Sequence, residues 1–128
     1  MILSVKTHSR TELVDITGEV QAAVREAGIR EGLCMIYVPH TTAAVTINEN
    51  ADPTVKDDML KVLNKVIPWD DGYRHLEGNS AAHIKSTLVG ASELVAVSGG
   101  KLQLGTWQGI FFCEFDGPRR RKAHVRFV

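Results

Sequence analysis

Residues 33–38 read Leu33-Cys34-Met35-Ile36-Tyr37-Val38, an almost wholly apolar run that lies between Gly32 and Pro39. A run of this length and composition is typical of a strand buried in a sheet, and the flanking glycine and proline mark its ends. The sequence therefore predicts a central strand here.

The chain before this strand predicts a half-buried strand and an amphipathic helix. Residues 3–7 alternate apolar and polar side chains, and the apolar residues of 16–27 recur at helical spacing. Asp15 or Thr17 can cap the start of this helix, and Gly28 can end it.

The chain after the central strand predicts another strand and two more helices. Residues 43–47 form the strand, and Asp52-Pro53 opens a helix with an N-cap followed by proline at the first helical position. Its predicted core stripe comprises Val55, Met59, Val62, Leu63 and Val66. The third helix runs from a cap at Asn79 or Ser80 to about residue 89, with Ala81, Ile84 and Leu88 facing inward.

The last third of the chain is rich in predicted strands. They cover residues 93–98, 108–115 and a closing segment in which Ala123, Val125 and Phe127 alternate with polar residues. Because no regular strand–helix–strand rhythm appears, we expect a single α+β domain over residues 1–128. Its sheets are expected to be largely antiparallel and sandwich-like, with two or three helices packed on one side.

The bulk composition excludes some classes of protein. The 128 residues are 44% hydrophobic and 23% charged, and 15 basic residues balance 15 acidic ones. Nucleic-acid binding, which usually shows a basic excess, is therefore not expected. No apolar run is long enough for a membrane span, and the N-terminus has no secretory signal pattern. Cys34 and Cys113 fit buried free thiols in the cytoplasm, with a disulfide or a metal thiolate as alternatives.

The densest polar chemistry lies in His75-Leu76-Glu77-Gly78-Asn79-Ser80-Ala81-Ala82-His83. Together with His40, which follows a strand and a proline, this segment supplies three imidazoles at points where the chain changes direction. His40, His75 and His83 match the ligands of a zinc-type site with one open coordination position. The alternative is three separate, hydrogen-bonded histidines.

Two positively charged features can hold an anion. The helix start at Asn79-Ser80 either caps its own helix or binds phosphate or carboxylate with its free N–H groups. Arg119 follows Asp116-Gly117-Pro118 and can clamp a phosphate. The alternatives for the basic run 119–122 are a solvated surface and a contact with RNA.

Two carboxylates are candidates for acid–base chemistry. Glu114 interrupts an apolar run at 110–115, so it either faces solvent on an edge strand or is buried with a partner. In the buried case it can serve as a base, an acid or a support for a metal ligand. Glu49 lies in a polar cluster at 48–50 that can position a nucleophilic water or bind a substrate amide.

Four motifs, in one order along nearly the whole chain, resemble those of the YjbQ-like family. They are His40-Thr41-Thr42-Ala43, Asn48-Glu49-Asn50-Ala51-Asp52-Pro53, His75-Leu76-Glu77-Gly78-Asn79-Ser80-Ala81-Ala82-His83, and Gly105-Thr106-Trp107-Gln108-Gly109-Ile110 with Glu114-Phe115-Asp116-Gly117-Pro118-Arg119. The resemblance implies a homotrimeric α+β protein with sites near subunit contacts.

The same resemblance implies a zinc ion on His40, His75 and His83. It also places Thr106, Gln108, Asn79 and Arg119 around the substrate. Some members are described as having a secondary thiamine-phosphate synthase activity, which joins a pyrimidine diphosphate to a thiazole phosphate.

Residues and resemblance together predict a cytoplasmic, metal-dependent enzyme that acts on a phosphorylated small metabolite. Zinc is the expected metal and magnesium a possible one, Glu114 or Glu49 is the acid or base, and Asn79, Ser80 and Arg119 hold anionic groups. Thiamine-phosphate synthase, a transferase, is the named form, and a metal-assisted hydrolase is the nearest variant. The rival hypothesis is a non-catalytic trimeric protein that binds a metal or a phosphorylated ligand.

Overall fold

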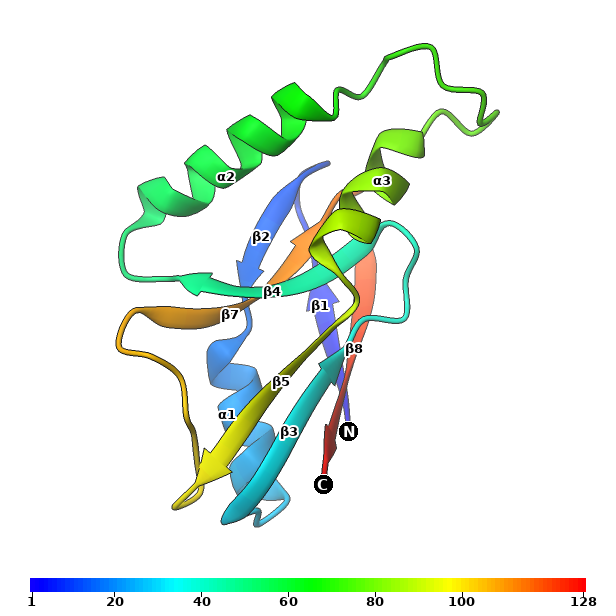
Figure 1. Ribbon diagram of the computed structural model, residues 1–128. Helices are drawn as coiled ribbons and strands as arrows, with labels where there is room; N and C mark the ends of the chain where they lie inside the picture. The colour runs from blue at the N-terminus through cyan, green and yellow to red at the C-terminus, as the bar shows by residue number, and fades with distance from the viewer.

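Two antiparallel sheets and three helices make up the computed structural model, which describes residues 1–128 (Figure 1). The larger sheet has the strand order β1-β8-β3-β5-β6, and the smaller has the order β2-β7-β4. The elements in chain order are β1 (Ile2–Lys6), β2 (Glu12–Asp15), α1 (Thr17–Glu26), β3 (Glu31–Tyr37), β4 (Ala43–Glu49), α2 (Pro53–Val66), α3 (Ser80–Val89), β5 (Ser92–Ser98), β6 (Lys101–Leu102), β7 (Gln108–Glu114) and β8 (Arg120–Phe127).

The predicted α+β fold with antiparallel sheets is confirmed, and β3 is the central strand of the larger sheet. Only one face of β3 is buried, however. Cys34 and Ile36 point into the core, whereas Leu33 and Tyr37 are exposed. The strand buried on both faces is β7, in which every residue after Gln108 is buried.

The prediction that the helices pack on one side is wrong, because the smaller sheet is covered on both faces. One face shares a core cluster with the larger sheet and α1, to which Val24, Val45 and Phe112 belong. The other face, with Phe111 and Phe115, is covered by α2 and α3. In Figure 1, α2 and α3 accordingly lie beyond the smaller sheet, while α1 lies behind the larger one.

The predicted inward face of α3 is confirmed for Ala81 and wrong for Ile84 and Leu88. Ile84 is 39% exposed and Leu88 67% exposed, whereas Ala81, Ala82, Lys85 and Ser86 are buried. The two alanines let the helix approach β4 closely, since the distance between packed elements depends on the side chains at the contact. This rotation turns Lys85 and Ser86 toward the body of the protein.

Other local predictions are confirmed or corrected in detail. Asp52 caps α2, because its side chain accepts a hydrogen bond from the main-chain N–H of Thr54 at 2.9 Å. The short strands β2 and β6 were not predicted, since four and two residues are too few to show a period.

None of the three helices is long and apolar enough to cross a bilayer.

Candidate functional site

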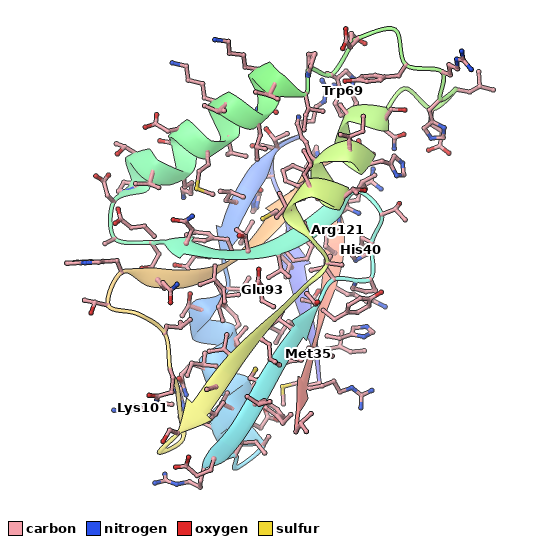
Figure 2. All side chains as sticks on the ribbon, viewed as in Figure 1. Met35, His40, Trp69, Glu93, Lys101 and Arg121 are labelled. Carbon is pink, nitrogen blue, oxygen red and sulfur yellow. The ribbon has the colours of Figure 1, made fainter.

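The loop between β3 and β4 and one side of α3 enclose a groove of about 420 Å³. Five of its eight lining residues are polar, and they include one histidine from each of the two elements. The residues that line it are His40, Thr41, Ala43, His83, Ser86, Thr87, Gly90 and Ala91. In Figure 2, His40 and Arg121 lie next to each other beside the lower end of α3.

A buried ion pair lies behind the loop that carries His40. Glu114 is 0% exposed and Arg121 is 3% exposed. Nε of Arg121 donates to Oε1 and Oε2 of Glu114 at 2.9 and 3.1 Å, and Nη2 also donates to Oε2. The hydroxyl of Thr7 and the main-chain N–H of Asp116 complete the set of donors to this carboxylate, at 2.7 and 3.0 Å.

Burial by itself raises the pKa of Glu114, but the hydrogen bonds from Arg121, Thr7 and the main chain of Asp116 outweigh it. The pKa of Glu114 therefore lies below its usual value, and the carboxylate is ionised near neutral pH. Of the two sequence alternatives for Glu114, burial with a partner is confirmed. With all its donors inside the protein, this carboxylate acts on a ligand only through the groups it holds.

Arg121 connects the ion pair to the loop that carries His40. Its Nη2 donates to Oγ1 of Thr42 at 2.8 Å and to the carbonyl oxygen of Thr42 at 3.3 Å. These bonds tie the start of β4 to β8. Glu114 and Arg121 thus fix the position of His40, two residues before Thr42.

His40 has a defined hydrogen-bonding state. Its Nε2 accepts a hydrogen bond from the main-chain N–H of Lys122 at 3.0 Å. Burial, and then the charge of Arg121, lower the pKa of His40, so the ring is neutral near pH 7. A neutral ring that accepts at Nε2 carries its proton on Nδ1, which remains free to donate.

α3 contributes the opposite wall of the groove. His83 is half-buried there, and its ring packs edge-on against that of His75, with 5.5 Å between the ring centroids. The hydroxyl of Ser86, about one turn further along, is buried and has no hydrogen-bond partner within the chain. An unpaired buried hydroxyl is unusual in a folded protein, and it indicates room for a polar ligand atom or water.

A second polar group gathers at the N-terminal end of α3. Asn79 occupies the cap position, but its side chain makes no capping hydrogen bond, and its amide donates to Oδ2 of Asp116 at 2.9 Å. Nη2 of Arg119 donates to the same carboxylate oxygen at 3.1 Å. Oδ1 of Asn79 is buried without a partner, and Ser80 is the first, half-buried residue of the helix. Asn79, Ser80 and Arg119 are thus brought together, as the anion-site prediction requires.

Three other predicted site residues lie elsewhere. Gln108 and Glu49 pair with each other at the far end of the β4–β7 ladder, and Thr106 is exposed in the loop before β7. Six residues of extended chain, or about 20 Å at 3.3 Å per residue, separate Glu49 from Ala43 in the groove. Within one chain, Glu49, Thr106 and Gln108 therefore do not join His40 and His83.

A family profile, curated sequences and solved structures all relate this chain to UPF0047 proteins. The sequence profile described as "UPF0047 protein YjbQ-like" matches residues 1–128. The UPF0047 protein YugU of Bacillus subtilis is 57% identical over 127 residues, which cover 98% of this chain and 96% of YugU. A UPF0047 protein of Methanocaldococcus jannaschii is 56% identical over 124 residues, covering 97% of this chain and 90% of that protein.

The chain belongs to the YjbQ-like family.

Solved structures similar to this chain share the fold. The crystal structure of the YugU orthologue from Clostridium acetobutylicum has a TM-score of 0.98 and 51% identity, and it covers 100% of this chain and 99% of its own. A protein from Aeropyrum pernix has a TM-score of 0.96 at 38% identity, with 100% of this chain and 96% of its own covered. The fold that the family resemblance implied is therefore shown.

The histidines of this YjbQ-like chain do not form a three-ligand metal cluster. No group of three His, Cys, Asp or Glu side chains is placed to hold an ion. His75 and His83 are neighbours, and His83 and His40 share the groove, but Nε2 of His40 is engaged by Lys122 and its Nδ1 carries a proton. As arranged, the donors of one chain do not fit a tetrahedral three-histidine site.

Sequence reasoning missed several residues of the site. Arg121 was placed in a basic run whose expected positions were a solvated surface or an RNA contact, yet it is buried in the ion pair. The alternation of the closing strand could have revealed this burial, because Arg121 lies on the same inward face as Ala123 and Val125. No sequence signal marked Ser86, since its burial follows from the rotation of α3.

Proposed function

We propose that this YjbQ-like protein is an enzyme that acts on a phosphorylated small metabolite bound in the groove between His40 and His83. The observation that carries the proposal is the convergence of two imidazoles and an unpaired, buried Ser86 hydroxyl from separate elements on one groove. Polar groups that converge in a concave site are the usual mark of a ligand-binding or active site.

The anionic end of the substrate is assigned to the N-terminal end of α3 and Arg119. A helix start offers free N–H groups and a positive dipole end, which suit a phosphate. Arg119 lies three residues before Lys122, whose main-chain N–H donates to Nε2 of His40, so the chain runs from Arg119 to the wall of the groove. Arg119 is held by Asp116 and half-exposed, and it can turn its remaining donors to a phosphate.

The histidines then divide the proton chemistry. In a hydrolysis, Nδ1–H of His40 donates to the leaving oxygen as its bond to phosphorus breaks, and His83 receives a proton from the attacking water. In the synthase form the attacking thiazole nitrogen carries no proton, so His40 donates to the departing diphosphate and His83 serves as a hydrogen-bond partner of the ligand. Glu114 and Arg121 are positioning residues, because they touch the loop of His40 rather than the groove. In this proposal the two histidines, and not Glu114 or Glu49, act as the acid and the base. Glu49 lies too far from the groove to take part within one chain.

The narrower form of the proposal is thiamine-phosphate synthase activity, which the family resemblance alone supports. The test is an assay of thiamine phosphate formation, with diphosphate release followed in parallel. The variants are His40→Gln and His83→Gln, with His8→Gln as the control because the side chain of His8 is exposed and does not line the groove. Product formed by the wild type and the control but not by the groove variants supports the synthase form, and no product with any of them removes it. The metal-assisted hydrolase is tested by phosphate release from monoesters.

Zinc, or magnesium in its place, remains part of the proposal at the level of the assembled protein. Because one chain does not arrange three ligands, a bound metal requires either a different rotamer of His40 or a donor from another copy. Elemental mass spectrometry on untagged protein, beside a His40→Ala/His83→Ala variant, tests this. About one zinc per chain that is lost in the variant supports a metal enzyme. If no metal is bound even after zinc is added, the histidines act as acid, base and hydrogen-bond donors to phosphate.

The rival function is a trimeric binding protein. The apolar side of α2 favours self-association, since Val62 is 56% exposed and Val66 is 69% exposed. We propose the homotrimer that the resemblance implies, and it is compatible with either function. A binding protein holds the phosphorylated ligand without turnover, so equal binding by wild type and the His83→Gln variant with no product in either favours it.

We propose a cytoplasmic location on the basis of the two cysteines. Cys34 and Cys113 are both free and buried, and burial raises their pKa values to about 11 and about 12. Neither thiol is a reactive thiolate or a metal ligand in this state. Free thiols without disulfides are typical of proteins in a reducing compartment.

A further inference from the structure

Lys85 has no partner of opposite charge although it is only 1% exposed. Its Nζ donates to Oδ1 of Asn64 at 2.6 Å, and none of the ion pairs in the chain includes it. Lysine is almost never fully buried without a partner, because a desolvated ammonium is costly. Here the only partner is a neutral amide, which leaves two of the three ammonium donors without an acceptor.

A cavity of about 270 Å³ lies next to this ammonium. Three separate parts of the chain form it: the loop between β1 and β2, the C-terminal end of α2 with the loop that follows it, and α3. The cavity is lined by Arg10, Thr11, Asn64, Pro68, Trp69 and Lys85. Its volume is just below the range of about 300–1,000 Å³ for drug-sized ligands, so it suits an ion or the end of a small molecule.

The cavity is rich in hydrogen-bond donors and contains no carboxylate. The guanidinium of Arg10 lies over the ring of Trp69, 4.1 Å from its centroid, and donates to no acceptor in the chain. The hydroxyl of Thr11 accepts from the amide of Asn64 at 3.1 Å and keeps its own hydrogen to donate. Two cations and a hydroxyl therefore face a space in which the chain itself supplies no negative group.

We propose that this cavity is an oxyanion site that takes the phosphate or carboxylate group of a small molecule between Lys85, Arg10 and Thr11. Trp69 holds the guanidinium of Arg10 flat, which preserves the edge that binds an oxyanion through two parallel hydrogen bonds. Lys85 supplies a second charge from the floor of the cavity, and Asn64 orients it.

This site is distinct from the groove of the proposed enzyme. No residue lines both, and neighbouring residues of α3 point to different sites: Ser86 lines the groove, whereas Lys85 lines the cavity. In Figure 2, Trp69 lies near the far end of α2, well away from His40. The oxyanion site can therefore be tested independently, because failure of the enzymatic proposal would not remove it.

The test is an NMR titration of isotope-labelled protein with inorganic phosphate and, separately, with acetate, each at constant ionic strength. We expect saturable shifts of the Trp69 indole N–H and of the Thr11 and Asn64 amides. Tighter binding of phosphate assigns the site to phosphorylated molecules, and tighter binding of acetate assigns it to carboxylates. If neither anion causes saturable shifts at these residues, the proposal is overturned.

Variants locate the binding. Arg10→Gln and Lys85→Met should each weaken the affinity about tenfold or more, because each removes a charge-assisted hydrogen bond. Arg126→Gln is the matched control, since Arg126 is an exposed arginine on β8. His40→Gln should leave the affinity unchanged, which separates this site from the groove. Arg10 is exposed, so Arg10→Gln decides the matter even if Lys85→Met unfolds, and wild-type affinity in Arg10→Gln contradicts the proposal.

Discussion

At the scale of single residues, the ion pair of Glu114 and Arg121 organises the site without entering it. Desolvation of two charges is expensive, and it is offset here because the carboxylate receives donors from three residues and the guanidinium also binds Thr42. The same pair fixes the loop that carries His40. A group can therefore be essential to this site while it remains out of reach of any ligand.

The pair predicts a large and asymmetric effect on stability. Glu114→Gln should lower the free energy of unfolding by about 3–5 kcal/mol, because it leaves the buried charge of Arg121 uncompensated. Urea denaturation at pH 7 measures this. The double variant Glu114→Gln/Arg121→Met should recover part of the loss, and Glu26→Gln, at an exposed glutamate, serves as the control. A loss below about 1 kcal/mol in the single variant would show that the pair contributes little.

The lowered pKa of Glu114 predicts how stability depends on pH. A carboxylate whose pKa is lower in the folded state stabilises the fold fully above its ordinary value of 4.5, and that contribution is lost as the pH falls through the lower folded value. Denaturation midpoints between about pH 6 and pH 3 should fall more steeply for the wild type than for Glu114→Gln. Parallel curves would contradict the assignment.

His40 predicts a spectroscopic result. Long-range proton–nitrogen NMR spectra should show its neutral ring protonated at Nδ1, because Nε2 accepts from Lys122. The ring should titrate below the ordinary histidine pKa of 6.5, since burial and the charge of Arg121 disfavour its protonated form. A proton on Nε2 at pH 8 would contradict the described geometry and would reopen Nδ1 for a metal.

At the scale of elements, pattern and capping predicted where most strands and helices lie. The apolar run of β3, the alternation of β8 and the Asp52-Pro53 start of α2 were each sufficient to place an element. The orientation of α3 was not predictable in this way. Its sequence is apolar on more than one side, and only contact with β4 decides which side is buried. The positions of Lys85 and Ser86, and with them two candidate sites, follow from that choice.

The start of α2 gives a prediction at this scale. Asp52→Ala should lower the free energy of unfolding by about 1 kcal/mol, because the side chain caps the helix through Thr54. Asp57→Ala, within the same helix and without a capping bond, should change it by less than about 0.5 kcal/mol. Chemical denaturation of both variants measures the difference, and equal effects would show that the cap is not what stabilises the helix.

At the scale of the whole molecule, the two ends of the smaller sheet carry different parts of the motif set. The ion pair, His40 and the start of α3 gather at one end, whereas Glu49, Thr106 and Gln108 lie at the other. The order of the motifs along the chain could predict which residues belong to a functional site, but not which of them lie close together in the fold. Only the antiparallel pairing of β4 with β7 separates the two groups.

The exposed apolar face of α2 gives a prediction about assembly. A groove of about 540 Å³ lies along Val55, Met59, Val62, Leu63 and Val89. If this face contacts another copy, Val62→Glu should shift the protein from trimer to monomer in light scattering after size-exclusion chromatography. Lys61→Glu, on the exposed polar side, should not. A wild type that is monomeric at all concentrations removes the trimer.

If chemistry on a phosphorylated metabolite takes place between His40 and His83, turnover must depend on both histidines. Release of phosphate and diphosphate from a panel of phosphorylated small molecules should be followed for the wild type, His40→Gln, His83→Gln and the control His8→Gln, with and without added zinc or magnesium. Release is expected from the wild type and the control, with a loss of at least about a hundredfold in both groove variants. Release that persists in the groove variants, or none from any protein, would contradict it.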